Sequence, residues 1–152
     1  MRKWIATMAA VLMVMTAGTA MAADTANVDV TAAVAPACAF SSTPTLDFGT
    51  LDQASAADAT AAGNLVFWCT TGAVYTLTDQ NNPLVVDGAY PGTLISGGDT
   101  IPYTIAYTNT SGLGGGFGVP IASALTATIV NADYVGSPPG VYTETVTFTI
   151  TP

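Results

Sequence analysis

The residues of this chain that could do chemistry are few and nearly all acidic. Its 152 residues include ten Asp and Glu, two cysteines and no histidine, and the only basic side chains are Arg2 and Lys3. Without histidine the chain cannot build a Ser-His-Asp or Cys-His arrangement, and no unperturbed side chain titrates near neutrality. Because Lys and Arg neutralise phosphates, we expect no nucleic-acid partner. Any catalysis would have to rest on carboxylates alone.

Carboxylates can act in pairs or bind a cation. Asp47 and Asp52 flank a short strand and loop, and a pair of carboxylates is what glycoside hydrolysis needs. Asp79, Asn81 and Asp87 could offer oxygen ligands to calcium, although their spacing matches no calcium-loop motif. Solvated acids on turns explain both groups more simply. We therefore expect no catalytic residue, no metal site and no cofactor.

The two basic residues belong to an N-terminal export signal. They precede an apolar run over residues 4–15, and small residues follow it. This pattern is typical of a secretory signal peptide over residues 1–22, cleaved between Ala22 and Ala23. The run is shorter than the roughly 20 residues of a membrane helix, so we expect no membrane span in the mature chain. That mature chain would carry ten acidic residues and no basic one.

The two cysteines, Cys38 and Cys69, are more consistent with a structural role than with chemistry. Their spacing is not C-x-x-C, and no other soft metal ligand accompanies them. An even number of cysteines in an exported chain favours a disulfide. We expect a Cys38–Cys69 bond that stabilises the fold by about 3–4 kcal/mol.

Apolar and polar residues alternate with period two along most of the chain, which is typical of half-buried strands. No segment has a helical pattern of useful length. We predict one all-β domain over 35–152, an immunoglobulin-like sandwich, with a closed barrel as the alternative. The predicted strands that matter below cover residues 23–34, 46–51, 64–70, 75–78, 101–107, 125–129 and 141–151.

The first of these strands is the most informative. Val28, Val30, Ala32 and Val34 share one of its faces, although chain ends usually fray. The strand is either an ordinary first strand of its own sandwich, or one that leaves its domain and completes a neighbour.

The order of motifs along the chain resembles the spore coat protein U domain family, which includes the major subunits of archaic chaperone–usher pili. The resemblance covers nearly all of the mature chain. Its motifs are V-A-P-A-C at 34–38, L-D-F-G-T at 46–50, a strand ending in Cys69, Y-T-L at 75–77, Y-T-I at 103–105 and G-V-Y-T-E-T-V at 140–146.

This resemblance implies an incomplete immunoglobulin-like fold that lacks its final strand. A periplasmic chaperone would fill the gap first, and at an outer-membrane usher the N-terminal strand of the next identical or related subunit would replace it. The product would be a cell-surface fimbria that serves adhesion and biofilm formation. By position, the donor residues would be Val28, Val30, Ala32 and Val34. The acceptor groove would be lined by Val146, Phe148 and Ile150.

Other functions remain open from the sequence. A spore coat or extracellular matrix protein of the same fold is the first alternative, and a secreted carbohydrate-binding or hydrolytic β-sandwich is the second. The chain also departs from the family pattern: Glu144 stands where such pilins often have Asp, and Pro152 cannot donate to a sheet.

Two local features complete the expectations. The glycine-rich stretch 112–118 lacks the lysine and the following helix of a phosphate-binding loop, so we expect a flexible hairpin loop. Trp68 faces away from its apolar neighbours on a strict alternation. We expect it either to be covered by residues 84–95 or to be exposed for a subunit contact.

Overall fold

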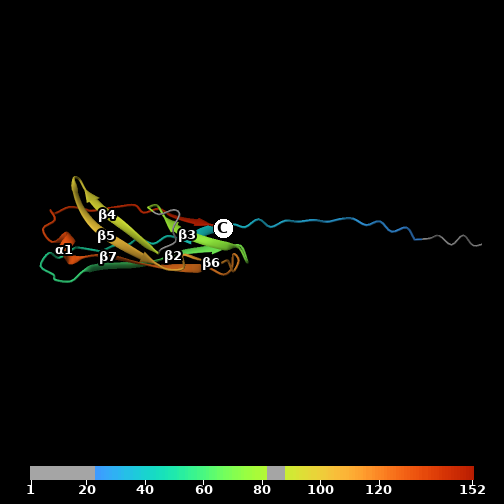
Figure 1. The fold of residues 1–152 in the computed structure, drawn as a ribbon, viewed down its shortest axis with the longest axis horizontal. Helices are drawn as coiled ribbons and strands as arrows, with labels where there is room; N and C mark the ends of the chain where they lie inside the picture. The colour runs from blue at the N-terminus through green and yellow to red at the C-terminus, as the bar shows by residue number, and fades with distance from the viewer. Residues whose placement is uncertain (1–22, 82–87) are drawn as a thin grey trace, which may run out of the picture. The chain divides into compact units, whose positions relative to one another are not determined.

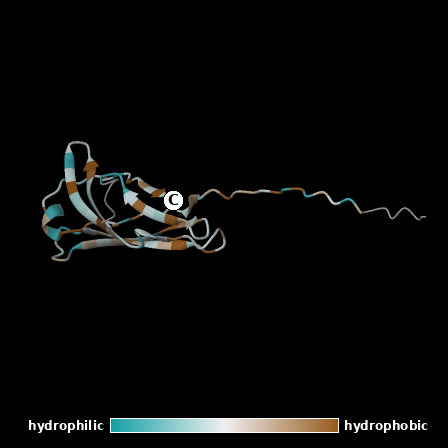
Figure 2. Cartoon of the chain, turned by 45° about the vertical axis from the view of Figure 1, so that its right-hand side comes forward, coloured by the Kyte–Doolittle hydropathy of each residue, from teal (hydrophilic) through white to brown (hydrophobic). Residues whose placement is uncertain are grey.

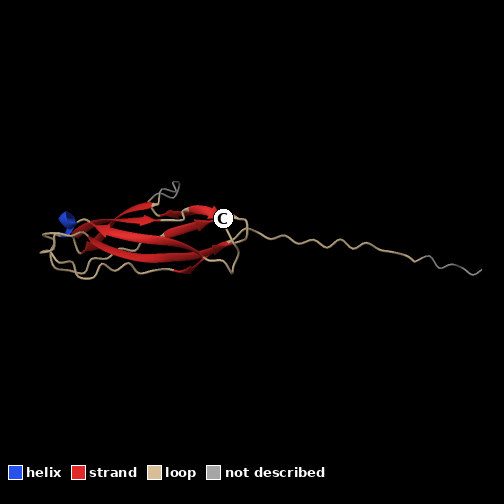
Figure 3. Cartoon of the chain, turned by 90° about the horizontal axis from the view of Figure 1, so that it is seen from below, coloured by secondary structure: helices blue, strands red, loops and turns tan. Residues whose placement is uncertain are grey.

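The computed structural model describes residues 23–81 and 88–152, and these are almost entirely strands and loops (Figure 3). Residues 34–152 form one compact unit, to which the described residues 23–33 do not belong. The elements are β1 (Cys38–Ser42), β2 (Ala59–Cys69), β3 (Val74–Asp79), β4 (Ala89–Ser96), β5 (Asp99–Tyr107), β6 (Ser111–Leu113), β7 (Ile121–Ile129), α1 (Asn131–Tyr134) and β8 (Phe148–Thr151).

The strands form two antiparallel sheets. The larger has the order β1-β2-β7-β5-β4, and the smaller has the order β6-β3-β8. The two sheets enclose the core as a curled immunoglobulin-like sandwich, with α1 at the end away from the C-terminus (Figure 1). The prediction of an all-β immunoglobulin-like sandwich is confirmed. The alternative of a closed barrel is wrong, because the strands fall into two separate sheets.

The core follows from the alternation along each strand, which is visible as changing colour in Figure 2. Every second residue of a strand points to the same face, so one face is buried and the other meets water. The two sheets contact each other through aromatic rings, including an edge-to-face pair of Phe67 and Tyr75 at 5.1 Å. The buried residues of the larger sheet include Leu65, Phe67, Ile101, Tyr103, Ile105, Leu125, Ala127 and Ile129.

Two glycines are needed because an aromatic ring lies over them. Gly92 of β4 pairs with Tyr103 of β5, and Gly112 of β6 pairs with Tyr75 of β3. A Cβ atom at either glycine would collide with the ring of its partner. The rings cover the backbone that a glycine leaves bare, which stabilises both strand pairs.

The glycine-rich stretch is more ordered than the sequence suggested. Its first residues form β6, which pairs with β3, so the expectation of a flexible hairpin loop is wrong there. Gly114 is buried against the backbone of Cys69 and Thr70, where a Cβ atom has no room. Its carbonyl accepts a hydrogen bond of 2.8 Å from the N–H of Gly72, and its own N–H donates over 2.8 Å to Ala73.

This stretch also explains the position of Trp68. The indole is half-buried, and its ring meets that of Phe117 edge to face at 5.2 Å. Part of its cover thus comes from the glycine-rich stretch, whereas residues 84–87 of the expected cover lie outside the described residues. The sequence could not show this contact, since the two residues lie on different elements.

Candidate functional site

A groove runs along the side of the sandwich where neither sheet continues. β1 and β8 lie at the edges of their sheets, and each is bonded to one neighbouring strand. The groove consists of two hollows of about 560 and 860 Å³. They form one continuous depression, because the residues lining both are Thr45, Leu46, Phe48, Leu94 and Glu144.

One wall of the groove is the segment after β1. Pro44, Leu46 and Phe48 are half-buried and alternate with exposed Thr45 and Asp47. The segment thus has the alternation of a strand, but it belongs to none. The predicted strand over 46–51 is wrong in this respect, because no neighbouring strand is there to pair with its backbone.

The opposite wall is the segment that leads into β8. From residue 141 to 150 exposed and half-buried side chains alternate without interruption, yet only Phe148–Thr151 forms a strand. This part pairs with β3, whereas the preceding part has a single isolated bridge, between Thr143 and Ile95. The predicted strand over 141–151 is therefore formed only at its end. Residues 141–147 alternate like a strand but form no ladder of backbone hydrogen bonds.

The floor of the groove is the apolar core itself. Apolar residues of the larger sheet form it, among them Leu65, Tyr103, Ile105 and Leu125 in the first hollow and Ile101 and Ile129 in the second. These floor residues are buried, whereas the side chains of the two walls that face the groove are half-buried. The half-buried apolar side chains of the walls are the surface that an apolar occupant would cover.

One carboxylate stands among these apolar residues. Oε1 of Glu144 accepts a hydrogen bond of 2.6 Å from the hydroxyl of Tyr90, and Oε2 accepts one of 2.8 Å from the N–H of Thr93. Both donors belong to β4, so the carboxylate holds the wall segment to that strand. A charged residue on the inward face of a predicted strand was the sequence signal for this role.

The pKa values of two tyrosines near Glu144 are raised. Burial, and then the hydrogen bond to Glu144, raise the pKa of Tyr90 to about 12. Burial and the same carboxylate also raise the pKa of Tyr103. Gln80 extends the network, because its Nε2 donates to the Tyr90 hydroxyl over 2.8 Å and its Oε1 accepts from the N–H of Thr147 over 2.8 Å.

The other carboxylates serve local structure. Asp47 accepts a hydrogen bond from the N–H of Gly49 over 2.8 Å, and Asp52 accepts one from the N–H of Ala54 over 2.9 Å. Such Asx turns are ordinary turn chemistry. They fit the interpretation of these acids as turn residues.

The calcium interpretation gains no support. Asp79 is buried and accepts hydrogen bonds from the Tyr107 hydroxyl over 3.0 Å and from the N–H of Asn81 over 2.9 Å. Asp87 lies outside the described residues. Within 23–81 and 88–152, three or more potential metal ligands nowhere gather together.

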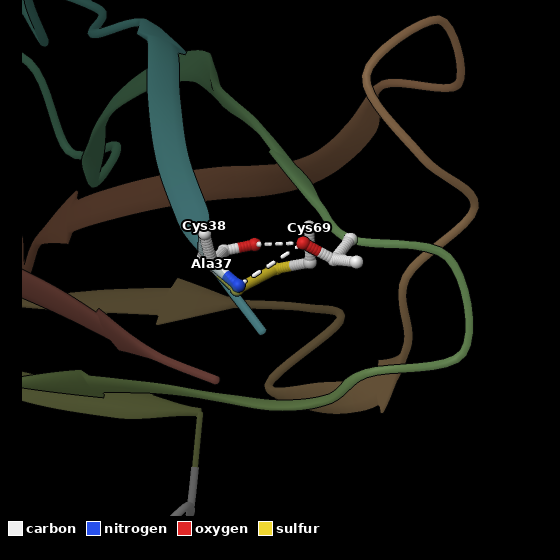
Figure 4. The surroundings of a disulfide bond; sticks show 4 residues. Ala37, Cys38 and Cys69 are labelled. Atoms are coloured by element: carbon white, nitrogen blue, oxygen red, sulfur yellow. Dashed lines mark hydrogen bonds between the residues drawn. A yellow bond between two sulfur atoms is a disulfide. The ribbon is translucent and has the colours of Figure 1, made fainter. Parts of the chain in front are cut away.

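The predicted disulfide is formed between Cys38 and Cys69, which lie directly opposite each other on β1 and β2 (Figure 4). Their Cα atoms are 4.1 Å apart. Next to them the N–H of Ala37 donates to Oγ1 of Thr70 over 3.0 Å, and the N–H of Thr70 donates to the Ala37 carbonyl over 2.8 Å. The bond thus fixes β1, an edge strand beside the groove, to β2.

Residues 23–37 belong to no strand, and all of them are exposed. Val28, Val30 and Val34 are 81%, 88% and 83% exposed. The segment thus forms no strand in this structure, and its role, as first strand or as donor, stays a prediction. The signal peptide over 1–22 lies outside the described residues and stays a prediction.

The residues predicted to line an acceptor groove lie on the wall that leads into β8. Val146 and Phe148 line the first hollow. Ile150 pairs with Leu77, is half-buried and packs on the core, but it is not among the residues that line the two hollows.

The fold defines an immunoglobulin-like structural domain with a groove along one side. The Spore Coat Protein U domain matches residues 24–149, and the chain belongs to this family of spore-coat and fimbrial structural proteins. Members form extracellular or surface structures. The comparison with curated proteins gives no match, and neither does the comparison with solved structures. Among the described residues, no helix has the length and apolar character needed to cross a membrane.

Proposed function

We propose that this protein is a pilin subunit that polymerises head to tail by donating its N-terminal strand to a neighbour. The observation that carries the proposal is the apolar groove beside residues 140–148, whose walls alternate like strands without a ladder. The same chain has an N-terminal segment with exposed valines at three of four alternate positions, Val28, Val30 and Val34. The exposed valines of the segment would be buried in the groove, and the backbone of the segment would pair with the groove walls.

The physical gain from insertion is large. An added strand would bond to the unpaired backbone of the wall segments, and its alternate side chains would fill the groove. Burying Val28, Val30 and Val34 contributes roughly 5–9 kcal/mol as an upper bound. In this proposal the donor face is Val28, Val30, Ala32 and Val34, and Val146, Phe148 and the adjoining Ile150 receive it.

Assembly and export follow from the same arrangement. Each subunit gives a strand to one neighbour and accepts one from another, and such an open contact generates a filament. An uncovered apolar edge would aggregate before assembly. We therefore propose a periplasmic chaperone and an outer-membrane usher as partners, and a surface fimbria used in adhesion and biofilm formation as the product.

A matched pair of substitutions tests this function. Val30→Asp puts a carboxylate on the donor face, where insertion would bury it in an apolar groove at a high cost. Thr31→Asp adds the same charge at the next residue, on the opposite face. We expect fibres, seen by electron microscopy, from Thr31→Asp and none from Val30→Asp. Normal fibres from Val30→Asp would overturn the proposal.

The family's description favours a second candidate, a spore coat or matrix protein that uses the same fold. Immunogold labelling of the producing cells separates the two. Label along thin filaments supports the fimbria, whereas label in a continuous layer supports the coat.

A further inference from the structure

We propose that Glu144 sets the register of the inserted strand by lying opposite Ala32 of a second copy of this chain. The occupant is residues 26–34 of that copy, inserted antiparallel to the wall segment 142–150. This inference rests on the proposed function, and it adds the alignment of donor and acceptor, on which specificity depends.

The acceptor side offers a series of inward positions with one charge in it. Glu144 is half-buried, and its two oxygens are already held by Tyr90 and Thr93. A branched apolar side chain placed over this carboxylate would remove water from a charge without supplying a donor, which is costly. The other inward positions are Tyr142, Val146, Phe148 and Ile150.

The donor side offers a matching series with one small residue between valines. Its inward positions are Ala26, Val28, Val30, Ala32 and Val34. With Ala32 opposite Glu144, antiparallel pairing puts Val30 opposite Val146 and Val28 opposite Phe148. The smallest apolar side chain of the series thus lies over the charge. Val28 and Val30 cover the first hollow.

The next antiparallel register that offers an alanine to Glu144 is unfavourable. It would use Ala26, which moves Val30 opposite Gly140. Asp24 would then face Val146 inside the first hollow. This register moves Val28 and Val30 from the first hollow to Tyr142 and Gly140 of the second. It also buries a carboxylate among apolar side chains, which opposes binding.

The parallel orientation is unfavourable for two reasons. With Ala32 opposite Glu144 it would place Pro36 opposite Phe148, where a proline cannot donate to a ladder. It would also bring Asp24 to position 136, three residues from exposed Asp133, and like charges repel. In the antiparallel register Pro36 lies at the mouth of the groove, opposite Gly140.

Disulfide trapping in the full mature chain tests the register. Thr31 is the outward neighbour of Ala32, and the proposed register puts it directly opposite exposed Thr145. Directly opposite residues on antiparallel strands can form a disulfide, whereas positions two residues away lie too far apart. The matched set is Thr31→Cys combined with Thr143→Cys, with Thr145→Cys or with Thr147→Cys, so every variant exchanges threonine for cysteine at an exposed position.

We expect assembled Thr31→Cys/Thr145→Cys protein to give a ladder of covalent multimers on a non-reducing gel, several-fold stronger than that of the other two pairs. An equal or stronger ladder from the Thr143→Cys pair indicates the parallel orientation or a shifted register and overturns the inference, as does one from the Thr147→Cys pair. In both cases the proposed function survives, because fibres form. If electron microscopy shows no assembly of any variant or of the unsubstituted chain, the proposed function fails and the register fails with it.

Discussion

The hydroxyl of Tyr90 donates a hydrogen bond of 2.6 Å to Oε1 of Glu144, and this contact joins β4 to a chain segment that has almost no ladder of its own. The segment is one wall of the open groove. A strand is normally held by the hydrogen bonds of its backbone. The position of this segment depends instead on hydrogen bonds made by side chains. Glu144 therefore helps to keep this wall of the groove in place.

Removing this carboxylate should loosen the wall. We expect Glu144→Ala to lower the free energy of unfolding by about 1.5–3 kcal/mol, because hydrogen bonds to charged groups contribute that much. Urea unfolding in the Val30→Asp background measures the effect without contributions from assembly. The control is Thr145→Ala, an exposed neighbour, which should change stability by less than about 0.5 kcal/mol. Equal stability of the two variants would contradict the role given to Glu144.

Alkaline pH should destabilise the domain through its buried tyrosines. The pKa of Tyr90 is raised from 10.0 to about 12 by burial and by Glu144. Because the folded state favours the neutral phenol, its contribution is complete below pH 10 and is lost as the pH rises toward 12.

Ultraviolet absorbance of the phenolates measures this directly. Tyr90 and Tyr103 should ionise later than free tyrosine while the domain stays folded. Tyr90→Phe should reduce the loss of stability at high pH. Ionisation of every tyrosine near the ordinary value, in folded protein, would rule out the burial described for them.

The Cys38–Cys69 bond should contribute about 3–4 kcal/mol, since it closes a loop in the unfolded chain. We expect the Cys38→Ser/Cys69→Ser double variant to lose this much in reversible denaturant unfolding. Chemical reduction of the unsubstituted chain should give the same loss. An unchanged midpoint in both experiments would show that β1 is held in place without the bond.

Phe117 should control the environment of Trp68. In the mature chain Trp68 is the one tryptophan, so its fluorescence reports this contact alone. We expect Phe117→Ala to shift the emission to longer wavelength and to cost about 0.5–1.5 kcal/mol, the usual worth of an aromatic pair. Val135→Ala, at another exposed apolar site, serves as the control. Unchanged emission from Phe117→Ala would argue against the contact.

The sequence predicted the features that depend on local pattern. Period-two alternation identified the all-β class and the inward series of the last segment, and the cysteine count identified the disulfide. The order of motifs pointed to the family that the comparison then found. These features could be predicted because the alternation, the cysteine count and the order of motifs can be read from the sequence without knowing which distant segments are in contact.

The features that the sequence missed depend on contacts between distant residues. Alternation over 46–51 and 141–147 predicted strands, but a strand also needs a partner for its backbone. Among the described residues, these segments have only the bridge between Thr143 and Ile95. The role of Glu144 required β4 to lie beside it. Likewise, the glycine-rich stretch became ordered only through β3 and Gly114.

If residues 23–34 of one copy cover the groove of another, they should protect the backbone of the groove wall from amide hydrogen exchange. The acceptor is the full mature chain with Val30→Asp, whose own donor segment is disabled. A synthetic peptide of residues 23–35 is added, and the same peptide with Val30→Asp is the control. We predict that the unsubstituted peptide slows exchange over residues 141–147 and raises the thermal stability, while the control does neither. Fast exchange over 141–147 with both peptides, and no gain in stability, would contradict the account.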